Sequence, residues 1–391
     1  MFKHLFKLIW NKKKQNALLI TEMFISFLVI FAVATMMVYA YKNYRQPMGL
    51  DYEDVWVVNY RAPEGIRALD SVNLFLEGLK REVKAMPQVV EASYCGSNVP
   101  FSMNTFNTMA STDDKRQSTV NTYMVEPAYL AVTGMKMKSG RWVTKEDLVA
   151  TTPAVVVNAK VEETLFPGKT ALGQYLHADG SKLKIVGVVE DAKEKGAYQV
   201  VETGLYRPID SNSARWTSTL ILKMKPGTDA HFESRLFKMM ADRTGSTIEI
   251  EHLDDKLASK NKLSLVPLII LLIVGGFLII NVALGLFGVL WYNINKRRGE
   301  IGLRRAVGAS GGAVSWQLVQ EALFLATLAL LIGLFFAVQF PILHVFDLPS
   351  SVYLAAIGLS VAFIYILVFL CALYPGRQAA AIYPAVALHE E

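Results

Sequence analysis

The sequence predicts an α-helical membrane protein with four transmembrane helices and a large extracytoplasmic α+β domain. Of its 391 residues, 52% are hydrophobic and 19% are charged, whereas soluble domains carry about 25% charged residues. Four apolar runs are long enough to cross a bilayer, which takes about 20 residues of helix. The long region between the first two runs contains no such run, so we expect it to fold as a domain outside the membrane.

Each apolar run marks one transmembrane segment. The second run is the longest, and as a helix it would extend about 42 Å, more than the hydrocarbon layer needs. Its outer end is therefore expected to continue as a stalk toward the domain. The runs are Met23–Tyr41, Leu265–Tyr292, Ala322–Leu343 and Val352–Tyr374, and the segments predicted around them are 17–41, 263–292 with the stalk, 313–343 and 352–374.

Positive charges give the expected orientation. Lysines precede the first run, a Lys/Arg cluster fills the loop 293–312, and Arg377 follows the fourth run, whereas the link 344–351 has neither. Basic residues mark cytoplasmic span ends, so both termini and the loop 293–312 are expected inside and the region 42–262 outside. A cleaved signal peptide is the competing interpretation of the first run, but that run exceeds the usual apolar core of about 7–15 residues.

The leader 1–16 is expected to form a cytoplasmic amphipathic helix at the membrane surface. Phe2, Leu5, Phe6 and Ile9 share one helical face, and the lysines lie off it. A leader that only directs topology is a compatible alternative. The tail 375–391 is expected in the cytoplasm.

Two strand–helix–strand units bracket the outer region 42–262. In the first, "DVWVVNY" and "QVVEASY" are expected strands around an amphipathic helix; in the second, "STLILKMK" and "STIEIEH" surround another. Neither unit can cover a sheet of its own, so the two, at about 50–99 and 211–255, are expected to share one sheet. The stretch between them, about 100–210, is predicted to be a mostly β insert. Its polar segment 102–119 has no periodicity and is expected to be a loop.

Patterns typical of catalysis or metal binding are weak. Gly168-Lys169-Thr170 ends like a phosphate-binding loop, but Glu163 replaces the required first glycine. Ser310 lies in a G-x-S-x-G match without the strand that precedes a nucleophile elbow, so we predict a helix stop at Gly308 and a helix cap at Ser310. The six histidines are scattered without metal-ligand spacing. We therefore expect no catalytic residue, metal or cofactor in this chain.

The predicted spans carry no charged residue at mid-membrane, since Glu22 and Glu321 lie at span edges. Ion-coupled carriers place ionisable groups there, so an ion-driven carrier is not expected. Glycines in the second span would allow close contact with a helix of a second copy, and ordinary flexibility is the alternative. These glycines are Gly275, Gly276, Gly285 and Gly288.

The segment "NKRRGEIGLRRAVGAS" (295–310) is a charged helix between two apolar runs. On a helix, Leu303, Ala306 and Val307 form a small apolar face with Ile301 near its edge, and Glu300 can pair with Arg304 at i,i+4. Such a rigid basic and apolar surface suits docking of a cytosolic protein. The alternative is a topology signal that binds lipid headgroups.

These residues carry a resemblance to a known family. "KRRGEIGLRRAVGAS" resembles the signature of the MacB/FtsX-like ABC transporter permeases. The outer segments "MVEPAYLAVTGMKMKSGRWV", "VVVNAKVEETLFPGKTALGQYL" and "LKIVGVVED" resemble a MacB-type periplasmic domain, and "YPGRQAAAIYPAVALHEE" resembles the family's ending, with Arg377 alone where a richer basic cluster is common. The resemblance covers essentially the whole chain.

The resemblance implies a non-catalytic permease subunit in a bacterial inner (plasma) membrane, with a periplasmic or extracellular domain. It implies a homodimer or heterodimer and a coupling helix docked on a cytosolic ABC ATPase, which would bind ATP and magnesium and is expected on a separate chain. A periplasmic adaptor and membrane lipids are further expected partners, and nucleic acid is not. The implied docking residues are Arg297, Arg298, Glu300, Ile301, Leu303, Arg304, Arg305, Val307 and Gly308.

Two functions are compatible with this family. In the first, ATP hydrolysis moves the outer domain, which exports or extracts an antibiotic-like, peptide or lipoprotein substrate. In the second, an FtsX-like regulator or sensor acts on a periplasmic or cell-wall partner and transports nothing. The size of the outer region favours the MacB-type function.

Overall fold

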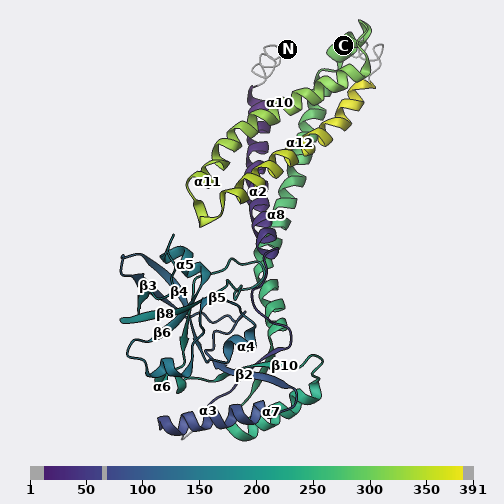
Figure 1. Cartoon of the computed structure of the whole chain (residues 1–391). Helices are drawn as coiled ribbons and strands as arrows, with labels where there is room; N and C mark the ends of the chain where they lie inside the picture. The colour runs from purple at the N-terminus through teal and green to yellow at the C-terminus, as the bar shows by residue number, and fades with distance from the viewer. Residues whose placement is uncertain (1–12, 64–67, 382–391) are drawn as a thin grey trace. The chain divides into compact units, whose positions relative to one another are not determined.

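The computed structural model describes residues 13–63 and 68–381 (Figure 1). Most of the predicted leader helix 1–16, and the tail beyond residue 381, lie outside the described residues. The chain divides into two compact units, one made of Met1–Lys42 and Leu265–Glu391 and the other of Asn43–Ser264.

Four long apolar helices make up the first unit, which confirms the predicted membrane fold. Each is long and apolar enough to span a bilayer. The long helices are α2 (Lys13–Tyr44), α8 (Leu253–Lys296), α10 (Gly311–Ala337) and α12 (Ser350–Ala380), and the short ones are α9 (Arg298–Ala306), α11 (Gln339–Ile342) and the 3-10 turn η2 (Val345–Asp347).

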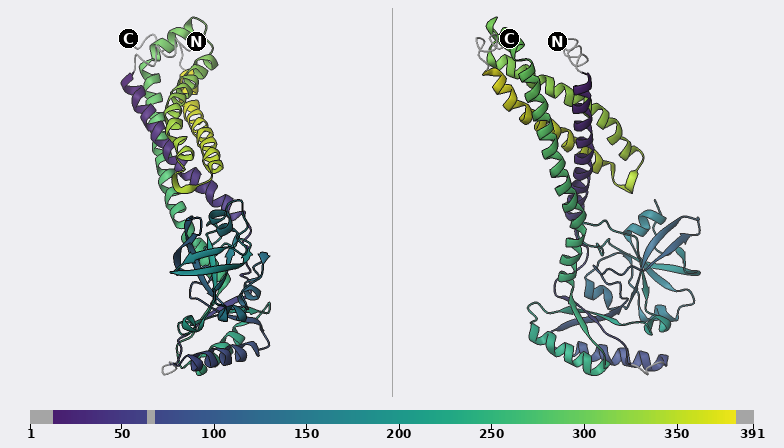
Figure 2. Two further views of the ribbon diagram at one scale, coloured as in Figure 1. Left: turned by 60° about the vertical axis from the view of Figure 1, so that its left-hand side comes forward. Right: turned by 180° about the vertical axis from the view of Figure 1, so that it is seen from behind.

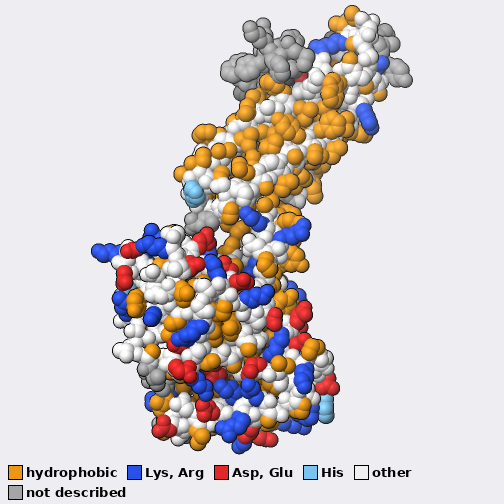
Figure 3. Space-filling view, viewed as in Figure 1, with side chains coloured by type: hydrophobic (Ala, Val, Ile, Leu, Met, Phe, Trp, Pro, Cys, Tyr) orange, Lys and Arg blue, Asp and Glu red, His pale blue; other side chains and the backbone are white. Residues whose placement is uncertain are grey.

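The core of the helical unit lies between α2, α10 and α12. Phe27 of α2 is fully buried there, and its ring occupies the space that the Cβ of any larger residue would need at Gly333 of α10. α8 is much less covered by the rest of the chain. Of its most apolar 18-residue stretch 6% is buried, whereas 39% of the corresponding stretch of α2 is buried. Apolar side chains accordingly gather on the surface of the helical unit in Figure 3, as expected for a lipid-facing or partner-facing surface.

α12 runs beyond the predicted end of the fourth span at residue 374. It continues through Pro375 to Ala380, and Gly376 lets this extension lie close to α10. A Cβ at Gly376 would lie 2.8 Å from Ser315 Oγ. The first residues of the predicted tail 375–391 are therefore helical and packed.

The second unit contains the predicted pair of strand–helix–strand units in one sheet. Its strands run in the order β11-β1-β10-β2, and all three pairings are antiparallel. Two amphipathic helices, α3 (Leu69–Lys84) and α7 (Ala230–Thr244), lie side by side and bury their apolar stripes on one face of this sheet (Figures 1 and 2). The strands are β1 (Val55–Asn59), β2 (Val89–Cys95), β10 (Thr219–Met224) and β11 (Glu249–His252).

The insert between these units is mostly β, as predicted. It has its own core, in which α5 (Ala159–Leu165) packs on the strands. β4 pairs with β9 and β6 with β8 in parallel, and the other pairs are antiparallel. Its strands are β3 (Asn107–Thr112), β4 (Gln117–Val125), β5 (Met137–Gly140), β6 (Ala154–Asn158), β7 (Tyr175–Ala178), β8 (Ser181–Val189) and β9 (Gly204–Pro208), and its other helices are α4 (Tyr129–Thr133), η1 (Lys145–Val149) and α6 (Ser211–Ala214).

The prediction of a loop at 102–119 was wrong. Residues 107–112 and 117–125 form the β3–β4 hairpin, with Asn107 opposite Asn121 and Ser111 opposite Gln117. The outward face of β3 is polar except for Met109, which is 56% exposed, and its buried positions are Ala110 and Thr112. Because these inward residues are small or polar, the sequence lacked the apolar alternation by which strands are recognised.

Candidate functional site

The charged segment between the second and third spans forms its own short helix. α8 ends at Lys296, and Arg297 leaves helical geometry at φ −104° and ψ 17° before α9 begins. Gly308 ends the turn at φ +105°, a conformation that favours glycine. Ser310 then caps α10, because its Oγ accepts a hydrogen bond from Ala313 N at 3.2 Å. The predicted stop at Gly308 and cap at Ser310 are confirmed, and Ser310 has a structural role.

One face of α9 is anchored inside the helical unit. Ile301 is 5% exposed and packs with Ile294 of α8, Val314 and Leu318 of α10, and Ala379 of α12. The sequence-based prediction puts Ile301 near the edge of an exposed apolar face and among the docking residues. In the structure its side chain is buried and fastens α9 to three long helices, and its part in docking stays a prediction.

Ionic contacts brace the same helix. Glu300 accepts from Arg297 Nε at 3.0 Å and from Arg304 Nη2 at 2.6 Å, which confirms the predicted Glu300–Arg304 pair. Arg297 Nη1 also lies 3.2 Å from Glu321 Oε2 of α10, and Arg304 Nη1 lies 3.0 Å from Gln317 Oε1. The side chains of Arg297 and Glu321 are 15% and 20% exposed, so solvent screens this pair less than a surface pair.

A further contact joins α9 to the end of α12. Arg305 Nη1 donates to Ala380 O at 2.6 Å, which occupies a carbonyl that has no partner within its own helix. Three of the predicted docking residues, Arg297, Arg304 and Arg305, therefore use some of their N–H groups for hydrogen bonds that hold α9 in place within the chain. Sequence reasoning missed Gln317 and Ala380. Glu321, an acid at a span edge, was the signal that could have indicated such pairing.

The opposite face of α9 is apolar and exposed. The side chain of Leu303 is 55% exposed and that of Val307 83% exposed, and Ala306 between them is also exposed. Gly308 lies open beside them, since a Cβ added there would meet nothing within 4 Å. Exposed apolar residues on a braced helix are typical of a protein contact surface. We call Leu303, Ala306 and Val307 the outer face of α9.

The glycines of the second span divide into two pairs. A Cβ at Gly285 would overlap the carboxylate of Glu22, and one at Gly275 would lie 3.4 Å from Val33 Cγ2, both on α2. These two glycines therefore pack α8 on α2 within the chain. Gly276 and Gly288 meet nothing within 4 Å. Contact with a second chain stays a prediction for all four glycines.

Gly285 and an open glycine are expected to respond differently to substitution. Gly285→Leu should lower the melting temperature of the detergent-solubilised chain by several degrees, because the larger side chain must displace Glu22 and separate α2 from α8. Gly358→Leu adds the same side chain to α12, where an added Cβ meets nothing within 4 Å, and serves as the matched control. Equal melting temperatures for the two variants would contradict the assigned packing of Gly285 on α2.

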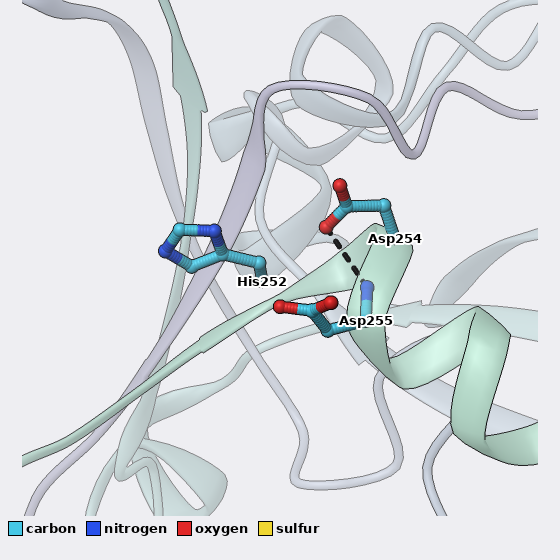
Figure 4. A group of neighbouring side chains, drawn as sticks. All are labelled: His252, Asp254 and Asp255. Atoms are coloured by element: carbon cyan, nitrogen blue, oxygen red, sulfur yellow. Dashed lines mark hydrogen bonds between the residues drawn. The ribbon is translucent and has the colours of Figure 1, made fainter. Parts of the chain in front are cut away.

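One group of potential metal ligands lies elsewhere, at the start of α8. The ligand atoms of His252, Asp254 and Asp255 lie within 4.8 Å of one another (Figure 4). The ring of His252 stacks on Trp56 at 4.6 Å, and its Nε2 lies 3.3 Å from Glu233 Oε2. Both aspartates are exposed in the first turn of α8, where negative charge is favourable at a helix N-terminus. These contacts account for the group, and the expectation of no metal stays a prediction.

The phosphate-binding-loop match is also structural. Gly168-Lys169-Thr170 follows α5 and precedes β7, whereas the motif requires a helix after the lysine. Lys169 Nζ lies 3.3 Å from Asp114 Oδ2, in an exposed ion pair. The segment is a surface turn.

Four membrane-type helices, an α+β domain inserted between the first two, and a braced helix after the second define the class of multi-pass transporter permeases. A family model of the MacB-like periplasmic core domain matches residues 17–236, and a model of the FtsX-like permease C-terminal region matches residues 272–384. The chain therefore belongs to the MacB/FtsX-like family of ABC transporter permeases.

Individual relatives are distant. The macrolide export ATP-binding/permease protein MacB of Sodalis glossinidius is 23% identical over 71% of this chain and 44% of its own length. The ABC transporter permease YknZ of Bacillus subtilis is 20% identical over 66% of this chain and 62% of its own length. The crystal structure of the periplasmic region of MacB from Actinobacillus actinomycetemcomitans covers 55% of this chain and 95% of that structure, with 16% identity and a TM-score of 0.38. The chain thus spans less than two thirds of the curated relatives it matches.

Proposed function

We propose that this chain is the permease subunit of an ABC transporter whose ATPase docks on the outer face of α9. The observation that carries the proposal is the two-sided construction of this helix. Ile301 and the arginine–glutamate contacts fasten one side, and Leu303 and Val307 are exposed on the other. A protein bound there would push on α8, α10 and α12 together, because α9 contacts all three.

The proposed work is done outside the membrane. α8 begins at Leu253, directly after the last strand of the domain, and ends at Lys296, directly before α9. A movement of α9 caused by ATP binding would therefore reach the domain through one helix. No transport path through the spans is needed, which agrees with the lack of mid-membrane charge in the sequence. Basic residues around α9 support a cytoplasmic location for it and for both termini.

We propose a dimer of permeases as the working form. α8 leaves an apolar surface uncovered that includes Ile273, Phe277, Ile280 and Leu284, and Gly276 and Gly288 would allow a second helix to approach it. Export or extraction of an amphiphilic substrate, such as an antibiotic, a peptide or a lipoprotein, is the activity that we propose. It is supported by the family and by the named export function of MacB.

A photocrosslinking experiment tests the docking site. A benzophenone amino acid at Val307 of the full chain, in membranes that contain the cognate ATPase, is expected to give one crosslinked product with the ATPase that depends on light. The same probe at Trp216, which is 87% exposed on the other unit, is the matched control and should give none. Crosslinks from Val307 to lipid alone, throughout a cycle of ATP addition and hydrolysis, would overturn the proposal.

A further inference from the structure

The unit 43–264 contains a cavity of about 530 Å³ that is lined only by residues with polar or charged side chains. Small-molecule sites of this size are usually lined by apolar and aromatic side chains, which this cavity lacks. The polar and charged side chains of its lining suit a hydrated, charged ligand better than an apolar one. Its lining residues are Thr105, Asn107, Thr119, Asn121, Lys195, Gln199, Glu202, Thr203 and Lys260.

Hydrogen bonds hold the walls of this cavity in place. Thr203 Oγ1 donates to Thr119 O at 2.7 Å, and Asn121 Nδ2 donates to Glu202 Oε2 at 2.5 Å, so the segment before β9 is tied to β4. Lys195 Nζ donates to Thr105 Oγ1, another lining residue, at 2.7 Å. The polar groups are therefore positioned before any ligand arrives, which lowers the entropic cost of binding.

Two ammonium groups line the cavity without a carboxylate at ion-pair distance among the residues that the structure describes. Among the described residues, Lys260 Nζ contacts Ser102 O at 3.4 Å, which is long for a hydrogen bond, and Met103 Sδ at 3.3 Å, which is a weak acceptor. Partial burial, and then the positive charge of Lys195, lower the pKa of Lys260 below its ordinary value, and Glu202 partly opposes this. An anion placed between the lysines would relieve their repulsion and satisfy their donors.

We propose that this cavity is a binding site for a small phosphate-type anion, which Lys195 and Lys260 hold by charge. The threonine, asparagine and glutamine side chains around them supply neutral hydrogen bonds, and Glu202 can accept a hydrogen bond from a hydroxyl group of the same ligand. A phosphate ester of a polyol fits this set of groups best. The ligand is either a soluble phosphate ester or the phosphoglycerol headgroup of a lipid.

Binding would add a link between two segments of the unit. The segment 195–203 already contacts α8, since Ala197 N donates to Asn261 Oδ1 at 3.0 Å and Gln199 Nε2 to Ser264 Oγ at 3.4 Å. An anion held by Lys195 and Lys260 bridges the same two segments. Binding of the ligand should therefore also raise the melting temperature of the chain. Anion binding at this site does not require the ATPase. The binding experiment can therefore fail without affecting the proposal that the ATPase docks on α9.

Calorimetric titration of the full chain in phosphatidylcholine nanodiscs tests the site, with inorganic phosphate, glycerol 3-phosphate and glycerol as probes at constant ionic strength. We expect saturable binding of both phosphates, tighter for glycerol 3-phosphate, and none of glycerol. Lys260→Gln should weaken phosphate binding about tenfold, the effect of losing one charged hydrogen bond. Lys238→Gln, which removes an exposed lysine of α7, is the matched control and should bind as the native chain does.

A second variant distinguishes a binding role from loss of folding. Glu202→Gln keeps the contact with Asn121 and removes the negative charge, so it should tighten binding of inorganic phosphate, an effect that unfolding cannot produce. Nanodiscs of phosphatidylglycerol identify the source of the ligand: weaker apparent binding of phosphate there indicates a lipid headgroup in the site, and unchanged binding indicates a soluble ester. Failure of both phosphates to bind the native chain in phosphatidylcholine, or equal binding by the Lys260→Gln and native chains, would overturn the proposal.

Discussion

Leu303→Glu is expected to abolish stimulation of the cognate ATPase by this permease and to prevent their co-purification. The side chain of Leu303 is 55% exposed in the helical unit, so glutamate is tolerated there in the permease alone. In the proposed complex the same position is buried, and a carboxylate would be desolvated without a partner. Loss of one apolar anchor and burial of a charge together cost at least about 3 kcal/mol, more than a hundredfold in affinity.

The control for this prediction is a leucine of similar exposure outside the proposed interface. Leu74 on α3 is 71% exposed, and Leu74→Glu should leave ATPase stimulation and co-purification unchanged. Substitution of Arg304 would be a poor test, because its contacts with Glu300 and Gln317 brace α9 itself. Retention of both ATPase stimulation and co-purification by Leu303→Glu would show that the outer face of α9 is not the docking surface.

The membrane fold could be predicted from sequence because its physical requirement is local. A span needs a continuous apolar run, and the stretch around Phe27 or Ile364 shows that requirement without knowledge of its neighbours. The strand–helix–strand units were equally visible, since Leu236 and Met240 repeat at helical spacing. The strand β3 was missed because its buried side chains, Ala110 and Thr112, are small or polar.

The site was only half predictable for a related reason. α9 has apolar residues on two faces, and its nine-residue sequence alone does not determine whether Ile301 or Leu303 points inward. That choice is made by Val314, Leu318 and Ala379, which are distant in sequence. The polar cavity is a stronger case, because Lys195 and Lys260 belong to no motif and meet only in the folded unit.

A second large effect is expected from pH, through the buried carboxyl of Glu194. Glu194 is 8% exposed, and its Oε1 accepts from Tyr206 Oη at 3.1 Å. Burial raises its pKa from 4.5 to about 7, although hydrogen bonds from Tyr123 and Tyr206 and the charge of Lys195 oppose the rise; Glu202 adds to it. The folded chain therefore holds a proton between pH 4.5 and about 7 that the unfolded chain releases.

The sign follows from this difference in bound protons. The contribution of Glu194 to stability is complete below pH 4.5, falls as the pH rises, and is lost above about 7. The total change is on the order of 3 kcal/mol, from about 1.4 kcal/mol for each pH unit. Carboxyls with lowered pKa, such as that of Asp147 beside Arg141, act in the opposite sense and at more acidic pH. The domain of the native chain should thus be less stable at about pH 8 than at about pH 5.5.

Urea unfolding of the full chain in detergent, followed by tryptophan fluorescence, measures this difference. Glu194→Gln keeps a group that can accept from Tyr206 and cannot ionise, so its domain should be about equally stable at the two pH values. Glu190→Gln, at an exposed carboxylate just before the same segment, is the matched control and should keep the native pH dependence. Stability that rises with pH over this range in the native chain would mean that Glu194 is ionised in the fold. A fall that persists in Glu194→Gln would assign the effect to another group, such as Asp191, whose pKa burial also raises.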